Sequence, residues 1–279
     1  MRSANADIFN HDTEAADYDR DVLNESDPVR AGYREILGWV IQQAQITPTL
    51  RVLELGSGTG NLSALIVSCR ELVSVDVSGK MEAVAKFKLR HLAHRRFIKA
   101  DILEVFRQGL GQFDAVISTY AVHHLTDHEK HQLFELVFAC LSPGGRAVFG
   151  DLMVLNGSEK EEKIQQYLAK GDQATAQAIS EEFFWLLDTA IGDLERLGFQ
   201  VSTARFSELS YGLVAQKLNL RGNAGPHCDR RHRFLSSSIA RYQVWRRRSA
   251  RLLLDLAGRI RSLCTRSQAL ETLNRCGNP

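Results

Sequence analysis

The sequence lacks a hydrophobic run long enough to cross a membrane. The longest nearly apolar segment, Leu133 to Leu141, has nine residues and contains Glu135, whereas a bilayer-spanning helix needs roughly 18 or more. The N-terminal residues, Met1 to Asp12, also lack the apolar core of about 7 to 15 residues that marks a secretory signal peptide. We therefore expect no membrane span and a cytosolic location.

The sequence also lacks the cysteine and histidine patterns of disulfide-rich and metal-binding proteins. The cysteines number five, and no two form a C-x-x-C pair, so neither a disulfide framework nor a zinc ribbon is expected. His124, His128 and His131 lie close together in the chain, but their spacing does not give the H-E-x-x-H pattern of zinc proteases. No metal site is predicted.

Lysine is absent after Lys217, where the charge of the chain changes sign. Residues 219–279 hold 13 Arg and three acidic residues, a net charge of +10, while residues 1–218 hold 22 Lys and Arg against 30 Asp and Glu, a net charge of −8. We interpret residues 218–279 as a basic, arginine-rich extension, either helical or disordered. Three roles stay open for it: binding to nucleic acid or an anionic membrane, docking or self-association, and no specific role.

In the acidic part, short β-branched runs alternate with stretches of helical period, which is typical of a parallel sheet with helices on both faces. Predicted strands cover residues 51–55, 72–77, 97–99, 113–118, 146–150, 200–206 and 213–217, and predicted helices cover residues 30–43, 61–69, 80–92, 127–140, 159–170 and 173–197. Thr126 and Glu129 form a capping box that starts one of these helices. The sequence thus predicts an α/β domain over residues 31–217, with a helical insertion at 159–197 that roofs the ligand site.

A glycine-rich turn follows the first predicted strand, in the segment Val52 to Asn61. Gly56, Gly58 and Gly60 allow tight turning and close approach to a ligand, because glycine has no Cβ and tolerates a positive φ. The spacing departs from the G-x-G-x-x-G of dinucleotide loops, and no Gly-Lys-Ser/Thr follows, so NAD and ATP are the weaker interpretations. Glu54, at the end of the strand, disfavours a phosphate and suits a cationic amino-acid ligand.

The pattern E-x-G-x-G-x-G over Glu54 to Gly60 resembles motif I of class I S-adenosylmethionine (SAM) methyltransferases. Asp76 ends the second strand, where a carboxylate can accept both ribose hydroxyls. The resemblance implies that Asp101 binds the adenine amino group and that Ile102 lies against the ring. Two further segments, 113–118 and 141–145, resemble the fourth-strand motif and the turn before the fifth strand. The predicted cofactor residues are Glu54, Gly56, Gly58, Gly60, Asp76, Asp101, Ile102 and Ser118.

A narrower resemblance lies in Ser118 to Lys130, flanked by residues 58–62 and 148–151. These segments are similar to the YrrT family of bacterial SAM-dependent methyltransferases, and the resemblance covers roughly Phe9 to Lys217. It implies a Rossmann-like class I methyltransferase fold, with a seven-stranded, mostly parallel sheet whose last strand is antiparallel. SAM would be the cofactor.

Methyl transfer from a sulfonium requires alignment more than acid or base catalysis, and a base is needed only when the acceptor is protonated. The candidates are His123 and His124 after the fourth strand, Asp151 at the end of the fifth, and Tyr120. The alternative is that one histidine caps a helix or packs under the cofactor.

Residues 1–30 are interpreted as a lid, because Phe9, Asn10 and the segment Ala16 to Asp19 resemble the aromatic lid of many small-molecule methyltransferases; a disordered acidic leader is the alternative. The predicted activity is methylation of an O, N or S atom of a small molecule. Two other functions stay open: RNA methylation aided by the basic extension, and SAM binding without catalysis. The acidic part would repel phosphates, so nucleic acid is otherwise disfavoured as a partner. The acceptor and the oligomeric state are not predicted.

Overall fold

The computed structural model describes residues 2–4, 15 and 17–218. The basic extension after Leu218 lies outside the described residues, as do Phe9, Asn10 and Ala16 of the expected lid.

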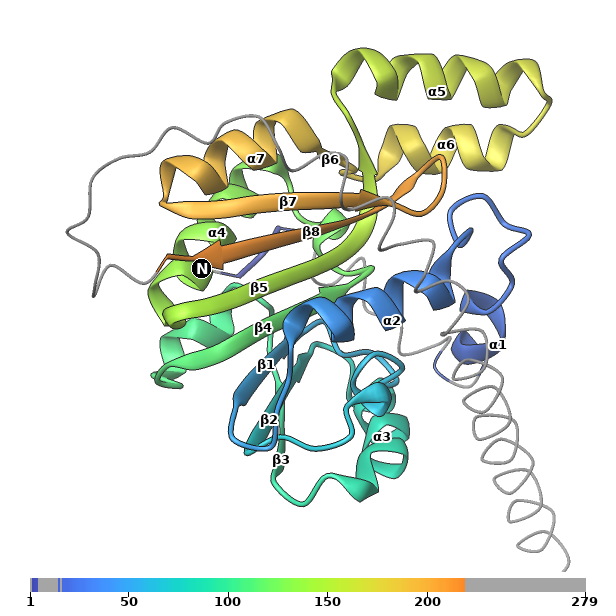
Figure 1. Ribbon diagram of the computed structural model, residues 1–279. Coiled ribbons are helices and arrows are strands. Elements are labelled where there is room, and N and C mark those ends of the chain that lie inside the picture. The colour runs from blue at the N-terminus through green and yellow to red at the C-terminus, as the bar shows by residue number, and fades with distance from the viewer. Residues whose placement is uncertain (1, 5–14, 16, 219–279) are drawn as a thin grey trace, which may run out of the picture. The chain divides into compact units, whose positions relative to one another are not determined.

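A central, mostly parallel sheet carries the fold (Figure 1), with strand order β3-β2-β1-β4-β5-β8-β7 and the short β6 paired to β5 beside this path. Six strands of the path run parallel to one another, while β8 is antiparallel to both β5 and β7. The expected class I architecture, with an antiparallel last strand, is confirmed, and β6 is an addition to the seven predicted strands. The strands are β1 Arg51–Leu55, β2 Glu71–Asp76, β3 Arg95–Lys99, β4 Phe113–Thr119, β5 Leu141–Val154, β6 Trp185–Leu186, β7 Phe199–Arg205 and β8 Ser210–Lys217.

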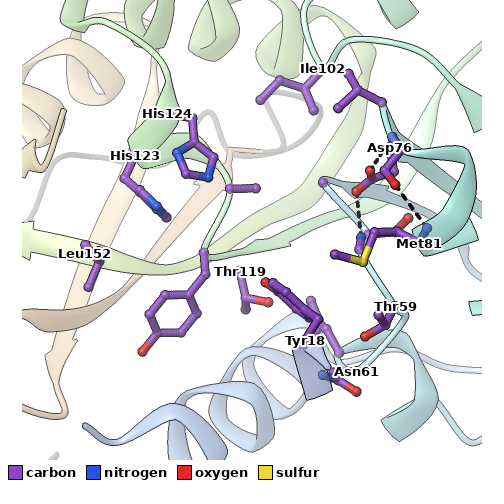
Figure 2. Close-up of a pocket in the computed structure, with 18 of the residues that line it drawn as sticks. Tyr18, Thr59, Asn61, Asp76, Met81, Ile102, Thr119, His123, His124 and Leu152 are labelled. Atoms are coloured by element: carbon purple, nitrogen blue, oxygen red, sulfur yellow. Dashed lines mark hydrogen bonds between the residues drawn. The ribbon is translucent and has the colours of Figure 1, made fainter. Parts of the chain in front are cut away.

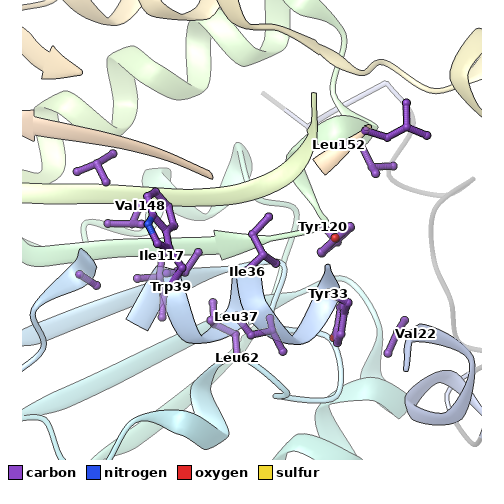
Figure 3. Packing of buried hydrophobic residues seen from close by; sticks show 14 of the residues in the cluster. Val22, Tyr33, Ile36, Leu37, Trp39, Leu62, Ile117, Tyr120, Val148 and Leu152 are labelled. Atoms are coloured by element: carbon purple, nitrogen blue, oxygen red, sulfur yellow. The ribbon is translucent and has the colours of Figure 1, made fainter. Parts of the chain in front are cut away.

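Helices cover both faces of the sheet, and each face has its own apolar cluster. Successive residues of β1 point to opposite faces, so Val52 belongs to one cluster and Leu53 to the other. Figure 3 shows the first cluster, where Ile36 of α2 packs toward Ile117 of β4 and Val148 of β5. The helices are α1 Tyr18–Val22, α2 Tyr33–Ala44, α3 Gly79–Lys88, α4 Asp127–Cys140, α5 Gly157–Ala169, α6 Gln173–Glu181 and α7 Leu187–Arg196.

The capping box of α4 forms as predicted. The hydroxyl of Thr126 accepts a hydrogen bond from the Glu129 N–H, and the Glu129 carboxylate accepts one from the Thr126 N–H at 2.9 Å. This arrangement satisfies two backbone donors that the first turn of a helix leaves without partners. The cap sets the start of α4 immediately after the segment that carries His123.

Two helix predictions are wrong. The helix expected over Asn61–Cys69 is a single 3₁₀ turn, Ser63–Leu65, and Ile66 is already extended. The β-branched Ile66 and Val67 favour this early end because they lose side-chain freedom in a helix. The long helix expected over Gln173–Leu197 is interrupted by β6, because the apolar Trp185 is fully buried beside β5.

Within the part of the chain that the structure describes, no helix is both long and apolar enough to cross a membrane.

Candidate functional site

A cavity of about 240 Å³ lies at the carboxyl edge of the parallel strands. The loops after β1, β2, β3 and β4 form its floor, and residues of α1, α2 and the segment before β6 close it from other sides. Figure 2 shows Asp76, Met81 and Ile102 at one end and His123, His124 and Leu152 at the other, with Tyr18 and Thr119 between them. Ligands of open α/β sheets bind at this edge.

The glycine loop adopts conformations that only glycine takes easily. Gly56 and Gly58 both line the cavity, with φ values of 68° and 50°. A Cβ at Gly56 would lie 2.2 Å from the Cβ of Ala121, whereas a Cβ at Gly58 would meet nothing within 4 Å. The absence of a side chain at Gly56 thus allows the loop to lie close to Ala121, which follows β4.

Asp76 connects the ends of β1 and β2. Its carboxylate accepts hydrogen bonds from the N–H groups of Gly58, at 2.7 Å, and Ser78, at 2.8 Å (dashed in Figure 2). These bonds hold the carboxylate at the rim of the cavity, beside the glycine loop. Asp101 and Ile102, which follow β3, line the same end of the cavity.

Three predicted cofactor residues do not line the cavity, and they support the loop from behind. Glu54 is only 1% exposed and accepts a hydrogen bond from the Ser74 hydroxyl at 2.9 Å; burial raises its pKa to about 7. Ser118 donates to the carbonyl of Leu55 at 2.7 Å. Gly60 leaves room for α3, since a Cβ there would lie 3.2 Å from the Cβ of Ala85.

At the other end of the cavity, His123 is held between two carboxylates. Its Nδ1 lies 2.5 Å from Oδ1 of Asp151, and its Nε2 lies 3.4 Å from Oε2 of Glu182. Because an ionised carboxylate only accepts hydrogen bonds, Nδ1 carries the proton toward Asp151. Nε2 is then the ring nitrogen on the side of Glu182, which lines the cavity with His123.

Asp151 is buried behind the cavity and contacts the side chain of His123, which lines it. It also accepts hydrogen bonds from the N–H groups of Val122, His123 and Leu152, at 3.0, 3.1 and 2.8 Å. These donors fix the carboxylate and therefore the plane of the imidazole. The ring of His124, whose centre lies 4.0 Å from that of His123, lines the cavity beside it.

Tyr120 has a positive φ of 49°, which is uncommon for a residue with a side chain. Its buried ring packs 5.2 Å from that of Tyr33, and its hydroxyl lies 3.2 Å from Oγ of Ser210. Burial raises the pKa of Tyr120 to about 12, so the phenol stays protonated at neutral pH. Tyr120 is therefore better suited to form a wall of the cavity than to act as a general base.

Residues that carry no sequence motif complete the site. Arg30 lines the cavity, and its guanidinium lies 5.3 Å from the centre of the Tyr120 ring. Among the described residues, no carboxylate forms an ion pair with Arg30. Glu182 comes from the helical insertion, and Ser3 comes from the N-terminal segment.

The carboxylate of Asp19 binds the short helix α1 to the glycine loop and to Lys88 at the end of α3. The carboxylate of Asp19 accepts hydrogen bonds from the Thr59 hydroxyl at 2.6 Å and the Asn61 amide at 3.0 Å, and it lies 2.5 Å from the Lys88 ammonium. Tyr18, the neighbour of Asp19, lines the cavity. The described end of the expected lid therefore lies over the loop.

Comparison with known proteins identifies the family to which the chain belongs. A family model described as "Methyltransferase domain" matches residues 52–145, from β1 into the first residues of β5. An uncharacterized methyltransferase of Anoxybacillus flavithermus is 32% identical over 219 residues, covering 76% of this chain and 97% of its own length. The chain belongs to the class I methyltransferase family. Enzymes of this family take the methyl group from SAM.

Two further proteins resemble this methyltransferase. An uncharacterized methyltransferase of Oceanobacillus iheyensis is 30% identical over 187 residues, which is 67% of this chain and 84% of the relative. The crystal structure of magnesium protoporphyrin IX methyltransferase from Synechocystis PCC 6803, with bound S-adenosylhomocysteine (SAH), has a TM-score of 0.56 and 18% identity. It covers 74% of this chain and 96% of its own, so the common fold spans almost the whole of that enzyme.

Proposed function

We propose that this methyltransferase transfers the methyl group of SAM to an O, N or S atom of a small molecule, with His123 as the general base. The observation that carries the proposal is the His123–Asp151 pair, 2.5 Å apart at the end of the cavity opposite Asp76. Kinship to the YrrT family and a cytosolic location remain predictions from the sequence.

The residues at the Asp76 end fit the cofactor. The open space on the Cβ side of Gly58 leaves room for ligand atoms at the loop, and the carboxylate of Asp76 suits the ribose hydroxyls. Arg30 is a cation in the cavity wall with no acidic partner among the described residues, so it would pair with the carboxylate of the methionine part. Asp101 would accept from the adenine amino group.

SAM supplies a methyl group activated by a sulfonium, so the residues of the chain mainly align the reactants. Correct alignment of two bound reactants can contribute roughly 7 to 11 kcal/mol to a rate. His123 removes a proton from a hydroxyl, ammonium or thiol of the acceptor, and Asp151 orients the ring and stabilises the imidazolium that forms. The Glu182 carboxylate lies 3.4 Å from Nε2 of His123. It would accept a hydrogen bond from the substrate and so position the group that receives the methyl.

Two features favour a small acceptor. The cavity is lined by Tyr18, Tyr33 and Tyr120, whose rings keep water from the reacting atoms. Residues 1–218 carry a net charge of −8, which opposes the approach of a nucleic-acid backbone.

The test is methyl transfer from tritiated SAM to a library of small metabolites. His123→Ala should lower kcat by about 100-fold to 10,000-fold, the usual contribution of a general base, while the Kd for SAH changes little. Asp151→Asn should also lower kcat, since a neutral amide does not stabilise the imidazolium that forms. His128→Ala is the control, because His128 is exposed on α4 and does not line the cavity.

The outcomes separate the parts of the proposal. Full turnover by His123→Ala would show that His123 is not the general base. SAH binding without turnover on any acceptor would indicate a SAM-binding protein, and turnover only in a parallel assay with RNA would indicate an RNA methyltransferase.

A further inference from the structure

The N-terminal segment makes a contact inside the cofactor cavity that the proposed reaction does not use. Ser3 lines the cavity at the Asp101 end and is 9% exposed. Its N–H donates to Oδ1 of Asp101 at 3.1 Å, and its hydroxyl donates to Oδ2 at 2.6 Å. The neighbouring Ala4 N–H donates to Oε1 of Glu129 at 2.7 Å, so two successive residues are bound.

These contacts engage both carboxylate oxygens of Asp101. Its Oδ1 also accepts from the N–H groups of Leu103, at 2.9 Å, and Glu104, at 3.2 Å. With the two donors of Ser3, the carboxylate accepts four hydrogen bonds, and an ionised carboxylate offers about four lone-pair sites. The donors of Leu103 and Glu104 belong to the loop itself, whereas those of Ser3 come from 98 positions away.

Asp101 is only 4% exposed, so a ligand can reach it only from the cavity, where Ser3 lies. A ligand with an exocyclic amino group needs the same carboxylate oxygens. The Ser3 N–H and O–H present two donors side by side, as such an amino group does.

We infer that residues 2–4 form a plug that occupies the adenine subsite at Asp101 and must leave before SAM or SAH binds. This inference rests on the proposed role of Asp101 in binding adenine. When the plug occupies the cavity in most molecules, the apparent Kd for the cofactor equals the intrinsic Kd divided by the fraction of molecules in which the cavity is open. The N-terminal segment then sets the cofactor concentration at which the enzyme becomes loaded.

The first test measures SAH binding to the full chain by titration calorimetry. Ser3→Pro removes both donors, because proline has no N–H, and should tighten SAH binding about tenfold, equivalent to about 1.4 kcal/mol. Ser3→Ala keeps the N–H and should give a smaller gain, while Ser3→Thr keeps both donors and should match the wild type. Ser26→Ala is the control, because Ser26 is exposed and its hydroxyl bonds to Asn24.

The second test follows the plug itself. Trypsin cleaves after Arg2, next to the buried Ser3, and saturating SAH should speed the loss of residues 1–2 in mass spectra of the intact protein. A ligand that merely stabilised the fold would slow this cleavage.

An unchanged or weaker SAH affinity in Ser3→Pro, together with slower cleavage after Arg2, would overturn the plug and show that the segment is neutral or covers the bound cofactor. Absence of SAH binding in the wild type and in every variant would contradict the proposed function, and the plug with it. SAH binding that all variants share equally would contradict the plug alone.

Discussion

Replacing Gly56 by alanine should damage the fold more than the same change at Gly58. Both residues line the cavity and both have a positive φ, of 68° and 50°. They differ in what a Cβ would meet: the Cβ of Ala121 at 2.2 Å for Gly56, and nothing within 4 Å for Gly58. The pair therefore separates the conformational cost of the loop from the cost of crowding.

The magnitudes follow from these two terms. A left-handed conformation costs a residue with a side chain roughly 1 to 2 kcal/mol, and overpacking typically costs roughly 1 to 3 kcal/mol. Gly58→Ala should lower the free energy of unfolding by about 1 to 2 kcal/mol. Gly56→Ala should lower it by about 2 to 5 kcal/mol, the sum of both ranges.

Urea unfolding of the two variants measures these losses, and the double variant Gly56→Ala/Ala121→Gly isolates the crowding. Removing the Cβ of Ala121 should recover about 1 to 3 kcal/mol of the loss, after correction with Ala121→Gly alone in a double-mutant cycle. Equal losses at Gly56 and Gly58, or no recovery in the double variant, would refute the crowding explanation.

Two more predictions concern charged groups around the loop. Burial raises the pKa of Glu54 to about 7 from 4.5, so the folded protein binds more protons than the unfolded chain between these pH values, and the free energy of unfolding falls by up to about 3 kcal/mol as the pH rises across them. Urea unfolding from pH 5 to 8 should show this fall for the wild type relative to Glu54→Gln, which keeps an oxygen for the Ser74 hydroxyl; a pH-independent difference would contradict it. Asp19→Asn should weaken SAH binding about tenfold in calorimetry, because α1 loses its charge-assisted hold on the loop. Asp21→Asn, whose side chain is 63% exposed on the same helix, should bind SAH like the wild type, and equal effects of the two changes would exclude the specific contact.

The features that the sequence predicted well depend on residues close together in the chain. The glycine loop, the capping box of α4 and the acidic residue at the end of β2 are local patterns whose spacing already determines their geometry. β1, β2, β4 and the buried half of β5 were predictable because buried parallel strands are continuous apolar runs. The parallel order then brings Gly56, Asp76 and Asp101 to one edge without further information.

The features that the sequence did not predict depend on long-range contacts. Glu182 faces His123 across 59 positions, and Ser3 binds Asp101 across 98, and neither has a motif around it. Trp185 interrupts the predicted helix because a buried place beside β5 outweighs the local helical period. Nothing in the sequence around Arg30, shortly before α2, distinguishes it from a surface arginine. Its place in the cavity wall is visible only in the structure.

The two ends of the cavity are supported by different parts of the chain, and this bears on how the enzyme would choose its acceptor. At the Asp76 end, the N–H groups that hold the Asp76 carboxylate, those of Gly58 and Ser78, lie within the residues matched by the methyltransferase domain family. At the His123 end, the Phe183 N–H donates to the His123 carbonyl at 3.1 Å, and the buried Lys130 ammonium donates to the Phe183 carbonyl at 2.6 Å. These bonds fix the insertion segment that carries Glu182. Substitutions in this segment can therefore reshape the His123 end while the glycine loop and Asp76 stay in place.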